Sequence, residues 1–498
     1  MNQKNKAKIF LSFFVLFFLY FFSRLQHLTA IPVFADEAIY IRWAQVIRNV
    51  ETLRFIPLTD GKQPLFMWLL AFGPLQFVKN PLVAGRLISV FAGFFTTIFL
   101  SISVCLVKSF SHQSKNPLDF IAFALKKHTS LFLLSSLLYI FLPFFFFFDR
   151  LALPDNLLST FTLLSFVISL LLAKFPRLDL SLILGAILGL AWLTKSPAIY
   201  FLVLSLATFF VLNFSQIKKS IFPLISLTLA FLIYNTLRLG PQFHMIALRN
   251  KDYVWPLYQI LRHPFDPLIP HLKDIISIFT SYLGLPLLFL FFFSLFYHKT
   301  KIKKISLITF LWFLLPLTAT AIFAKVFTAR YVLFTLPFLL IIISLNLSKL
   351  PRLLIFLPLL FNLIFIYKIS FQPFSQSLPS TETGYLTDWT AGWGIKEASD
   401  YLISRSQTAN VIVGTEGNFG TLPDGLQIYT DSLPRLTIIG QGLGFTKVPP
   451  QLLDAKNHGD EVYLLINRSR LTIPDYNSFT ILKQYPKPDG DQLLLLKI

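Results

Sequence analysis

Long apolar runs separated by short polar segments make up most of this chain. A run of about 20 apolar residues is long enough to cross the hydrocarbon core of a bilayer as a helix. The pattern predicts about eleven such spans, at roughly residues 9–29, 82–106, 130–148, 156–173, 180–195, 197–214, 220–237, 275–297, 305–324, 331–348 and 352–370. We therefore expect a polytopic α-helical membrane protein.

The polar segment of residues 30–81 is too long for a simple connector between spans. In residues 38–53, apolar side chains recur at helical spacing with Arg42, Arg48 and Glu51 between them, which predicts a helix lying in the membrane interface. Residues 66–77 are apolar but too short to span comfortably, so we expect a second interfacial segment there.

The tail after residue 371 has a different pattern. It is more polar and carries 13 of the 24 acidic residues. The pattern predicts a helix at 395–404 and strands at 411–413, 436–439, 462–466, 479–482 and 493–496. Mixed strand and helix signals indicate a small α/β domain. We therefore predict two domains, a membrane domain of residues 1–371 and an α/β domain of residues 372–498.

Composition supports a membrane protein and gives it an orientation. Of 498 residues, 55% are hydrophobic, and the net charge is +20. The Lys and Arg residues lie mostly in short loops between apolar runs, which fits the positive-inside rule and anionic lipid better than nucleic acid. The rule predicts a multi-pass protein of the cell membrane with a cytoplasmic N-terminus and an extracytoplasmic tail. The sole cysteine, Cys105, lies in an apolar run and excludes an intramolecular disulfide and a cysteine metal cluster.

The acidic pair Asp36-Glu37 follows directly after the first apolar run. Carboxylates are disfavoured next to a bilayer, so those found there usually have a chemical role. Because adjacent residues at a helix start point about 100° apart, one carboxylate is expected to face a cavity while the other supports it. The alternative is helix capping, in which an acid near the N-terminus favours the helix dipole.

Three basic positions suit a phosphate group at headgroup depth. Lys62 lies in a Pro-bounded turn shortly before Trp68, Lys195 separates two apolar runs, and Arg330 precedes Tyr331 at the start of another run. The alternative for each is a side chain that reaches the interface to anchor a helix.

Asp149, Arg150 and Asp155 lie on one predicted outward hairpin. They could complete a site with Asp36, or form an ordinary turn with a surface ion pair and a Pro-Asp helix start. The sequence contains no HExxH motif, Walker loop or nucleotide-binding fingerprint, so a soluble sugar nucleotide is not expected as a substrate.

Together these motifs resemble those of a known family. The elements Asp36-Glu37, Lys62-x-Pro64, Arg150 to Asp155, the segment 189–197 ending in Thr194-Lys195-Ser196-Pro197, and Arg330-Tyr331 come in the order seen in GT-C membrane glycosyltransferases. The bacterial branch similar to protein O-mannosyltransferases and to the aminoarabinose transferase of lipid A is the nearest match. The resemblance covers roughly residues 10–350, and no motif in the tail contributes to it.

The resemblance implies transfer of a sugar from a polyprenyl-phosphate donor to an extracytoplasmic acceptor, with inversion at the anomeric carbon. Asp36 is implied as the base, supported by Glu37 and Asp155. The residues implied to bind the donor phosphate are Lys62, Lys195 and Arg330. Those implied to contact the substrate are Tyr40, Trp68, Arg150 and Tyr331. No cofactor is required, although the carboxylates could bind Mg²⁺ or Mn²⁺.

The acceptor stays open among glycan, lipid and protein hydroxyl groups. An alternative from another class is a transporter or flippase of lipid-linked sugars. A transporter is expected to place charged residues or broken helices at mid-membrane, often in repeated halves. No internal repeat is visible here, and the acids cluster at one predicted face. A structural or sensor protein whose tail carries the function is a third interpretation.

Overall fold

The computed structural model describes residues 3–213, 217–297, 303–348, 350, 352–474 and 479–498. The chain is mostly helical and divides into two compact units. Unit 1 comprises Met1–Gln26, Phe55–Phe66 and Leu87–Tyr367, and unit 2 comprises His27–Arg54, Met67–Arg86 and Lys368–Ile498. Unit 2 thus joins the tail to two parts of the 30–81 segment, a grouping absent from the division predicted from the sequence.

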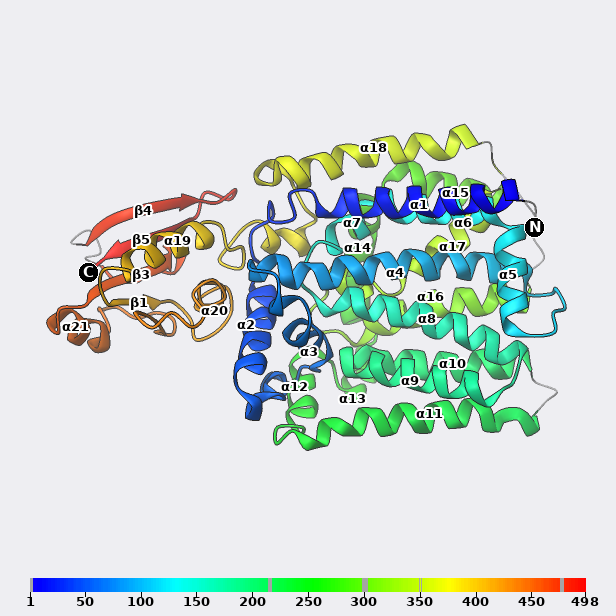
Figure 1. Ribbon diagram of the computed structural model, residues 1–498, viewed down its shortest axis with the longest axis horizontal. Helices are drawn as coiled ribbons and strands as arrows, with labels where there is room; N and C mark the ends of the chain where they lie inside the picture. Colours follow the sequence, from blue (N-terminus) through cyan, green and yellow to red (C-terminus); the bar gives the residue numbers. More distant parts are fainter. Residues whose placement is uncertain (1–2, 214–216, 298–302, 349, 351, 475–478) are drawn as a thin grey trace. The chain divides into compact units, whose positions relative to one another are not determined.

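Unit 1 is a bundle of helices whose long members run side by side in Figure 1. Pairs in contact include α8 with α9, α9 with α11, and α14 with α16. Its elements are α1 (Gln3–Leu25), η2 (Ile56–Asp60), α4 (Pro81–Ser109), α5 (Pro117–Lys127), α6 (Thr129–Phe141), α7 (Pro143–Phe148), α8 (Pro154–Lys174), α9 (Leu178–Thr194), η4 (Ser196–Ala198), α10 (Ile199–Leu212), η5 (Ile217–Ser220), α11 (Ile221–Tyr234), η6 (Asn235–Leu239), α12 (Met245–Tyr253), α13 (Leu257–Arg262), α14 (Phe265–Tyr282), α15 (Leu285–Tyr297), α16 (Lys304–Phe323), η7 (Ala329–Val332), α17 (Leu336–Leu347) and α18 (Arg352–Phe371). The first turn of α4 and the last turn of α18 extend into unit 2.

Within the described ranges, four helical segments are long and apolar enough to cross a membrane: Pro81–Ser109, Pro154–Lys174, Ile221–Leu239 and Lys304–Phe323. Counting each of two bent pairs as one span raises this to six, and shorter apolar helices fill most of the remaining predicted spans. The eleven spans stay a prediction, and residue 214, the predicted end of one of them, lies outside the described residues.

The span expected at 275–297 is not one straight helix. Helices α14 and α15 meet at an angle of 102°. Gly284, between them, has φ +81°, a left-handed conformation that other residues adopt only at a cost. Most of α14 lies before residue 275, in the polar 238–274 segment between two predicted spans.

A buried charge pair ties α1 to the residue that follows α7 inside unit 1. Arg24 Nε lies 3.2 Å from Asp149 Oδ2, and both side chains are fully buried. Tyr20 and Tyr139 donate their hydroxyls to the same carboxylate at 3.0 Å. Separating the two charges would leave each of them buried without a partner, which costs free energy. The network therefore holds these helices in one arrangement.

Unit 2 contains, among its described residues, a five-stranded sheet of order β2-β1-β3-β5-β4. Its elements are α2 (Ala35–Asn49), η1 (Glu51–Leu53), α3 (Leu65–Phe72, whose first two residues belong to unit 1), η3 (Pro74–Gln76), η8 (Pro373–Ser375), η9 (Ser380–Tyr385), α19 (Ile395–Ser406), β1 (Val411–Thr415), α20 (Asp424–Gln427), β2 (Leu436–Gly440), α21 (Pro450–Asn457), β3 (Glu461–Asn467), η10 (Arg468–Arg470), β4 (Thr480–Pro486) and β5 (Gln492–Lys497). The predicted helix and all five predicted strands overlap observed elements.

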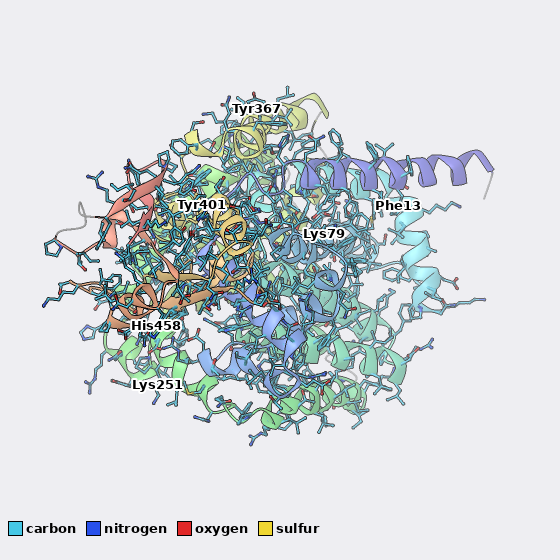
Figure 2. The ribbon with its side chains drawn as sticks, turned by 60° about the vertical axis from the view of Figure 1, so that its left-hand side comes forward. Phe13, Lys79, Lys251, Tyr367, Tyr401 and His458 are labelled. Carbon is cyan, nitrogen blue, oxygen red and sulfur yellow. The ribbon has the colours of Figure 1, made fainter. Side chains whose placement is uncertain are left out.

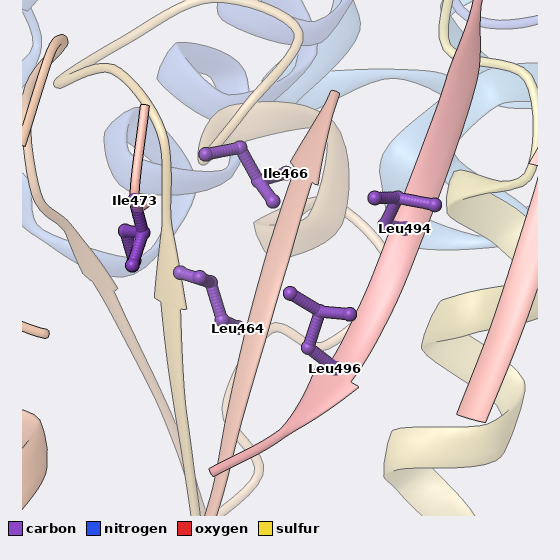
Figure 3. Close-up of a cluster of buried hydrophobic side chains, with 5 residues drawn as sticks. All are labelled: Leu464, Ile466, Ile473, Leu494 and Leu496. Atoms are coloured by element: carbon purple, nitrogen blue, oxygen red, sulfur yellow. The ribbon is translucent and has the colours of Figure 1, made fainter. Parts of the chain in front are cut away.

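Strand β1 pairs in parallel with β2 and β3, and β5 runs antiparallel to β3 and β4. One hydrophobic cluster of the sheet is formed by Leu464, Ile466, Ile473, Leu494 and Leu496 (Figure 3). Tyr401 of α19, labelled in Figure 2, meets the ring of Tyr463 edge-on at 6.1 Å. The apolar runs of β3 and β5 are continuous rather than alternating, and their central residues are buried on both faces of the sheet.

Helix α2 is the helix predicted at 38–53, but it has a protein partner in unit 2. It packs against α20, and Arg42 Nη1 lies 2.8 Å from Asp431 Oδ1. Gln45 donates to the backbone carbonyl of Ile428 at 2.8 Å. The apolar stripe of α2 that predicts a helix in the membrane interface thus belongs to a helix that packs on the tail. Helical periodicity alone does not distinguish a membrane from a protein partner.

Candidate functional site

The centre of the candidate site in unit 1 is an ion pair between Asp155 and Lys195. Pro154 begins α8, where its missing N–H is tolerated, and Asp155 follows in the first turn. Lys195 lies directly after the last residue of α9, with an extended backbone (φ −164°, ψ 146°). Because α8 and α9 pack together, the start of one and the end of the other meet, and Lys195 Nζ lies 2.5 Å from Asp155 Oδ1.

This ion pair leaves hydrogen-bonding capacity on both partners. The Asp155 side chain is only 2% exposed, and its Oδ2 is buried without a hydrogen-bond partner in the described part of the chain. Lys195 is 24% exposed, and an ammonium has three donors, of which Asp155 uses one. The lysine can therefore contact a ligand while Asp155 holds its side chain in place.

Arg330 and Tyr331 belong to η7, close to Lys195. Lys195 Nζ lies 4.8 Å from the centre of the Tyr331 ring, and the Arg330 guanidinium lies 5.5 Å from it. Both distances are within the range of cation–π attraction. Tyr331 thus contacts two cations through its ring, which lowers the cost of holding like charges together.

Lys62 is positioned by a turn packed against α12. Gly61 ends η2 with φ +67°, and a Cβ there would lie 2.9 Å from the Met245 carbonyl oxygen. Asp60 forms an ion pair with Arg249 at 2.5 Å, which ties the turn to the same helix. As a result Lys62 Nζ lies 3.4 Å from the Tyr253 hydroxyl and 4.4 Å from the centre of its ring.

The three predicted phosphate-binding cations come together. Gln63 donates to the Ser196 hydroxyl at 2.7 Å, which links the residues that follow Lys62 and Lys195. The charges of Arg330 and Lys62 both act on the Lys195 ammonium. Asp155 pairs with Lys195, and Asp60 Oδ2 lies 3.9 Å from Lys62 Nζ. Three cations with these two carboxylates, near the ends of apolar helices, still make a site of net positive charge that suits a phosphate.

Asp36 and Glu37 lie in the first turn of α2, in unit 2. Glu37 is fully buried: its oxygens accept from Arg86 Nε at 2.8 Å and Arg86 Nη2 at 2.7 Å, and from the Phe34 backbone N–H at 3.0 Å. Arg86 also donates to the carbonyls of Leu28, Ile31 and Pro32. Glu37 thus both caps α2 and anchors it, whereas Asp36 is half-buried.

The remaining predicted residues have partners outside the cation group. Arg150 is buried, donates to the Gln26 carbonyl at 3.0 Å and lies over Phe146. In unit 2, Tyr40 is buried 6.0 Å from the Trp43 ring, and Trp68 donates to the Arg54 carbonyl at 2.7 Å. Asp149 belongs to the buried pair with Arg24 described above.

Several participants were missed by the sequence analysis. Arg86, the partner of Glu37, had a usable signal, because it is a charged residue inside a predicted span. Tyr253 and Arg249 had none: they lie in a basic segment, and only the packing of α12 on η2 brings them to Lys62. Gln63 and Ser196 lie inside quoted motifs, but their bond spans 133 residues of sequence.

Comparison with known proteins shows similarity in structure only. No protein-family model matches the chain, and no curated protein matches it in sequence. The crystal structure of ArnT from Cupriavidus metallidurans in the apo state superimposes with a TM-score of 0.58 at 13% identity, covering 99% of this chain and 98% of that one. The same protein bound to undecaprenyl phosphate gives a TM-score of 0.57 at 13% identity, covering 98% of each chain.

The similarity extends over both units rather than over the motif region alone. At 13% identity it establishes the fold, which includes the tail that the motifs did not reach. The resemblance to the aminoarabinose transferase branch is thereby confirmed at the level of structure. This chain has the fold of ArnT.

Proposed function

We propose that this protein is an integral membrane glycosyltransferase that moves a sugar from a polyprenyl-phosphate donor to an extracytoplasmic acceptor. The observation that carries the proposal is a group of three cations: Lys195 and Arg330 lie near the Tyr331 ring, Lys195 pairs with Asp155, and the charge of Lys62 acts on Lys195. It is supported by the shared fold with ArnT, of which one structure holds undecaprenyl phosphate. A lipid phosphate needs cations at the ends of membrane helices, and the cluster provides them.

In the proposed reaction, Asp36 takes the proton of the acceptor hydroxyl as that oxygen attacks the anomeric carbon. The bond from this carbon to the donor phosphate oxygen breaks, and its electron pair leaves with the polyprenyl phosphate. The three cations stabilise the negative charge that grows on the phosphate. Attack opposite the leaving group inverts the anomeric carbon.

Asp155 and Glu37 have supporting roles in this proposal. Asp155 orients Lys195 through their ion pair, and Glu37 keeps the first turn of α2 in place through Arg86. Neither role requires a metal ion. The sugar and the acceptor are left open by the proposal.

The test is turnover of a panel of polyprenyl-phosphate sugars by the purified protein in lipid nanodiscs, beside Asp36→Asn. We expect one donor to be transferred or hydrolysed, with loss of turnover in the variant. A wild-type rate for Asp36→Asn would overturn the assignment of the base. Movement of lipid-linked sugar across liposomes without any turnover would replace the enzyme by a transporter.

A further inference from the structure

A second basic surface, separate from the phosphate cluster, lies on the 238–274 segment of unit 1. A pocket of about 500 Å³ is lined by Trp255, by residues of α13 and α14, and by Lys325. Its cations include Arg262 and Lys325. Its one acidic lining residue, Asp266, is 76% exposed and lies 3.6 Å from His263. The pocket therefore favours an anion.

Most of the lining residues recur regularly along two consecutive helices, α13 and α14. Tyr258, Arg262, Asp266 and Pro270 recur every four residues, and each is followed by another lining residue. The adjacent positions Leu257, Leu261, Phe265 and Ile269 are all at least 50% exposed. A basic pocket thus lies beside a stripe of exposed apolar side chains. That combination is typical of helices lying at a membrane surface rich in anionic lipid.

The floor of the pocket is preorganised. His271 is 8% exposed, and its Nδ1 lies 2.7 Å from the Ala321 carbonyl oxygen. A carbonyl only accepts, so Nδ1 carries the hydrogen. Lys325 donates to the carbonyl of Lys251 (labelled in Figure 2) and lies 5.0 Å from the centre of the Trp255 ring. These bonds fix both groups before any ligand arrives.

We propose that this pocket binds the phosphate headgroup of an anionic bilayer phospholipid. Arg262 and Lys325 bind the phosphate, and the acyl chains lie along the stripe of Leu257, Leu261, Phe265 and Ile269. The two requirements of such a lipid, a cationic pocket and a neighbouring apolar track, are both met on adjacent faces of α13 and α14.

The pocket is connected to Lys62 through the backbone. Trp255 N–H donates to the Phe323 carbonyl at 2.8 Å, and Lys325 N–H donates to the Tyr253 carbonyl at 2.9 Å. Tyr253 in turn contacts Lys62. A bound headgroup would therefore steady the segment that carries Tyr253. The effect of the headgroup on Lys62 rests on the proposed function, whereas binding of the lipid in the pocket does not.

The experiment is native mass spectrometry of the full-length protein released from nanodiscs that contain equal parts of phosphatidylglycerol and phosphatidylcholine. The variant combines Arg262→Ala with Lys325→Ala. The matched control combines Arg238→Ala with Lys273→Ala, which removes two exposed cations of the same segment that do not line the pocket. No donor is present, so the result is independent of sugar transfer.

We expect the wild type and the control to retain phosphatidylglycerol over phosphatidylcholine. The pocket variant should lose about 25-fold in retention, since each of the two cations near an anionic surface contributes about fivefold. Equal retention in both double variants, or no preference for phosphatidylglycerol in the wild type, would overturn the proposal. Release of the lipid by inorganic phosphate would assign the pocket to soluble phosphate instead.

Misfolding is separated from loss of binding by a third variant, Arg262→Lys with Lys325→Arg, which keeps both charges. We expect this variant to retain the lipid. Loss of retention equal to that of the alanine variant would contradict a charge-based site.

Discussion

Glu37 and Asp155 are both buried carboxylates, but their different surroundings give them different roles. Glu37 has both oxygens occupied by Arg86 and by the Phe34 backbone. Asp155 has one oxygen on Lys195, which is itself partly exposed. A fully satisfied buried pair mainly specifies geometry. A pair with an accessible ammonium can also bind a ligand, and this is why we place Lys195 in the proposed donor site.

Replacement of Lys195 by alanine should lower kcat/KM for the polyprenyl-phosphate donor by about 10- to 100-fold, the usual loss for one charge-assisted hydrogen bond. The measurement is steady-state transfer in nanodiscs. Arg177→Ala is the matched control, because Arg177 precedes the first residue of the same helix and pairs with exposed Asp179. Equal losses in the two variants would remove Lys195 from the site.

At the scale of elements, short helices and turns position the side chains of both units. The turn of η2 holds Lys62 against α12, and the end of α9 holds Lys195 against α8. In unit 2, α20 packs on α2, and its first residue, Asp424, is 8% exposed and accepts from the Gly420 backbone N–H. Burial raises the pKa of Asp424 from its ordinary value of 3.8 to about 6, against the opposing effects of that hydrogen bond and of Arg42.

The raised pKa of Asp424 makes the stability of unit 2 depend on pH. Between about pH 3.8 and 6 the folded protein holds a proton that the unfolded chain has released, so stability falls as pH rises through this window. Asp424→Asn should therefore raise the melting temperature at pH 7.5, by the equivalent of about 1–3 kcal/mol, and have little effect at pH 3.5. The measurement is thermal unfolding at both pH values. An equal shift at both would show that the effect is not one of ionisation.

At the scale of the whole molecule, the tail forms one compact unit with two parts of the first polar segment, within His27–Arg54 and Met67–Arg86. Arg42 and Gln45 of α2 contact the region that follows α20, so Asp36 is carried by a helix that packs on the tail. This grouping gives the tail a direct structural connection to the proposed base, and it explains why residues 30–81 need more length than a connector. The predicted orientation places this whole unit outside the cell.

Cysteine labelling tests that orientation. Cys105 is buried and is the sole cysteine of the sequence, so Cys105→Ser gives a clean background. We expect Asn457→Cys, on the exposed end of α21, to react with a membrane-impermeant maleimide in intact cells. Gln113→Cys, in the exposed turn between α4 and α5, should react only after permeabilisation. The reverse pattern would invert the topology.

The sequence by itself determined the class of the protein, the helix and strands of the tail, and the order of the site motifs. These features depend on local periodicity and composition, as at Val411–Thr415 or in the run after Pro154. The sequence did not predict the bend at Gly284. It also did not predict the packing partner of α2, because apolar spacing does not say what covers an apolar face.

Tertiary structure alone decided which side chains meet. Asp155 and Lys195 are 40 residues apart, and Lys62 and Tyr253 are 191 apart. It also decided which member of the acidic pair has the supporting position: Glu37 is held by Arg86, whereas its neighbour Asp36 is half-buried. The partners of a charge are set by the packing of distant helices, and burial then decides whether that charge is held as structure or left accessible to a ligand.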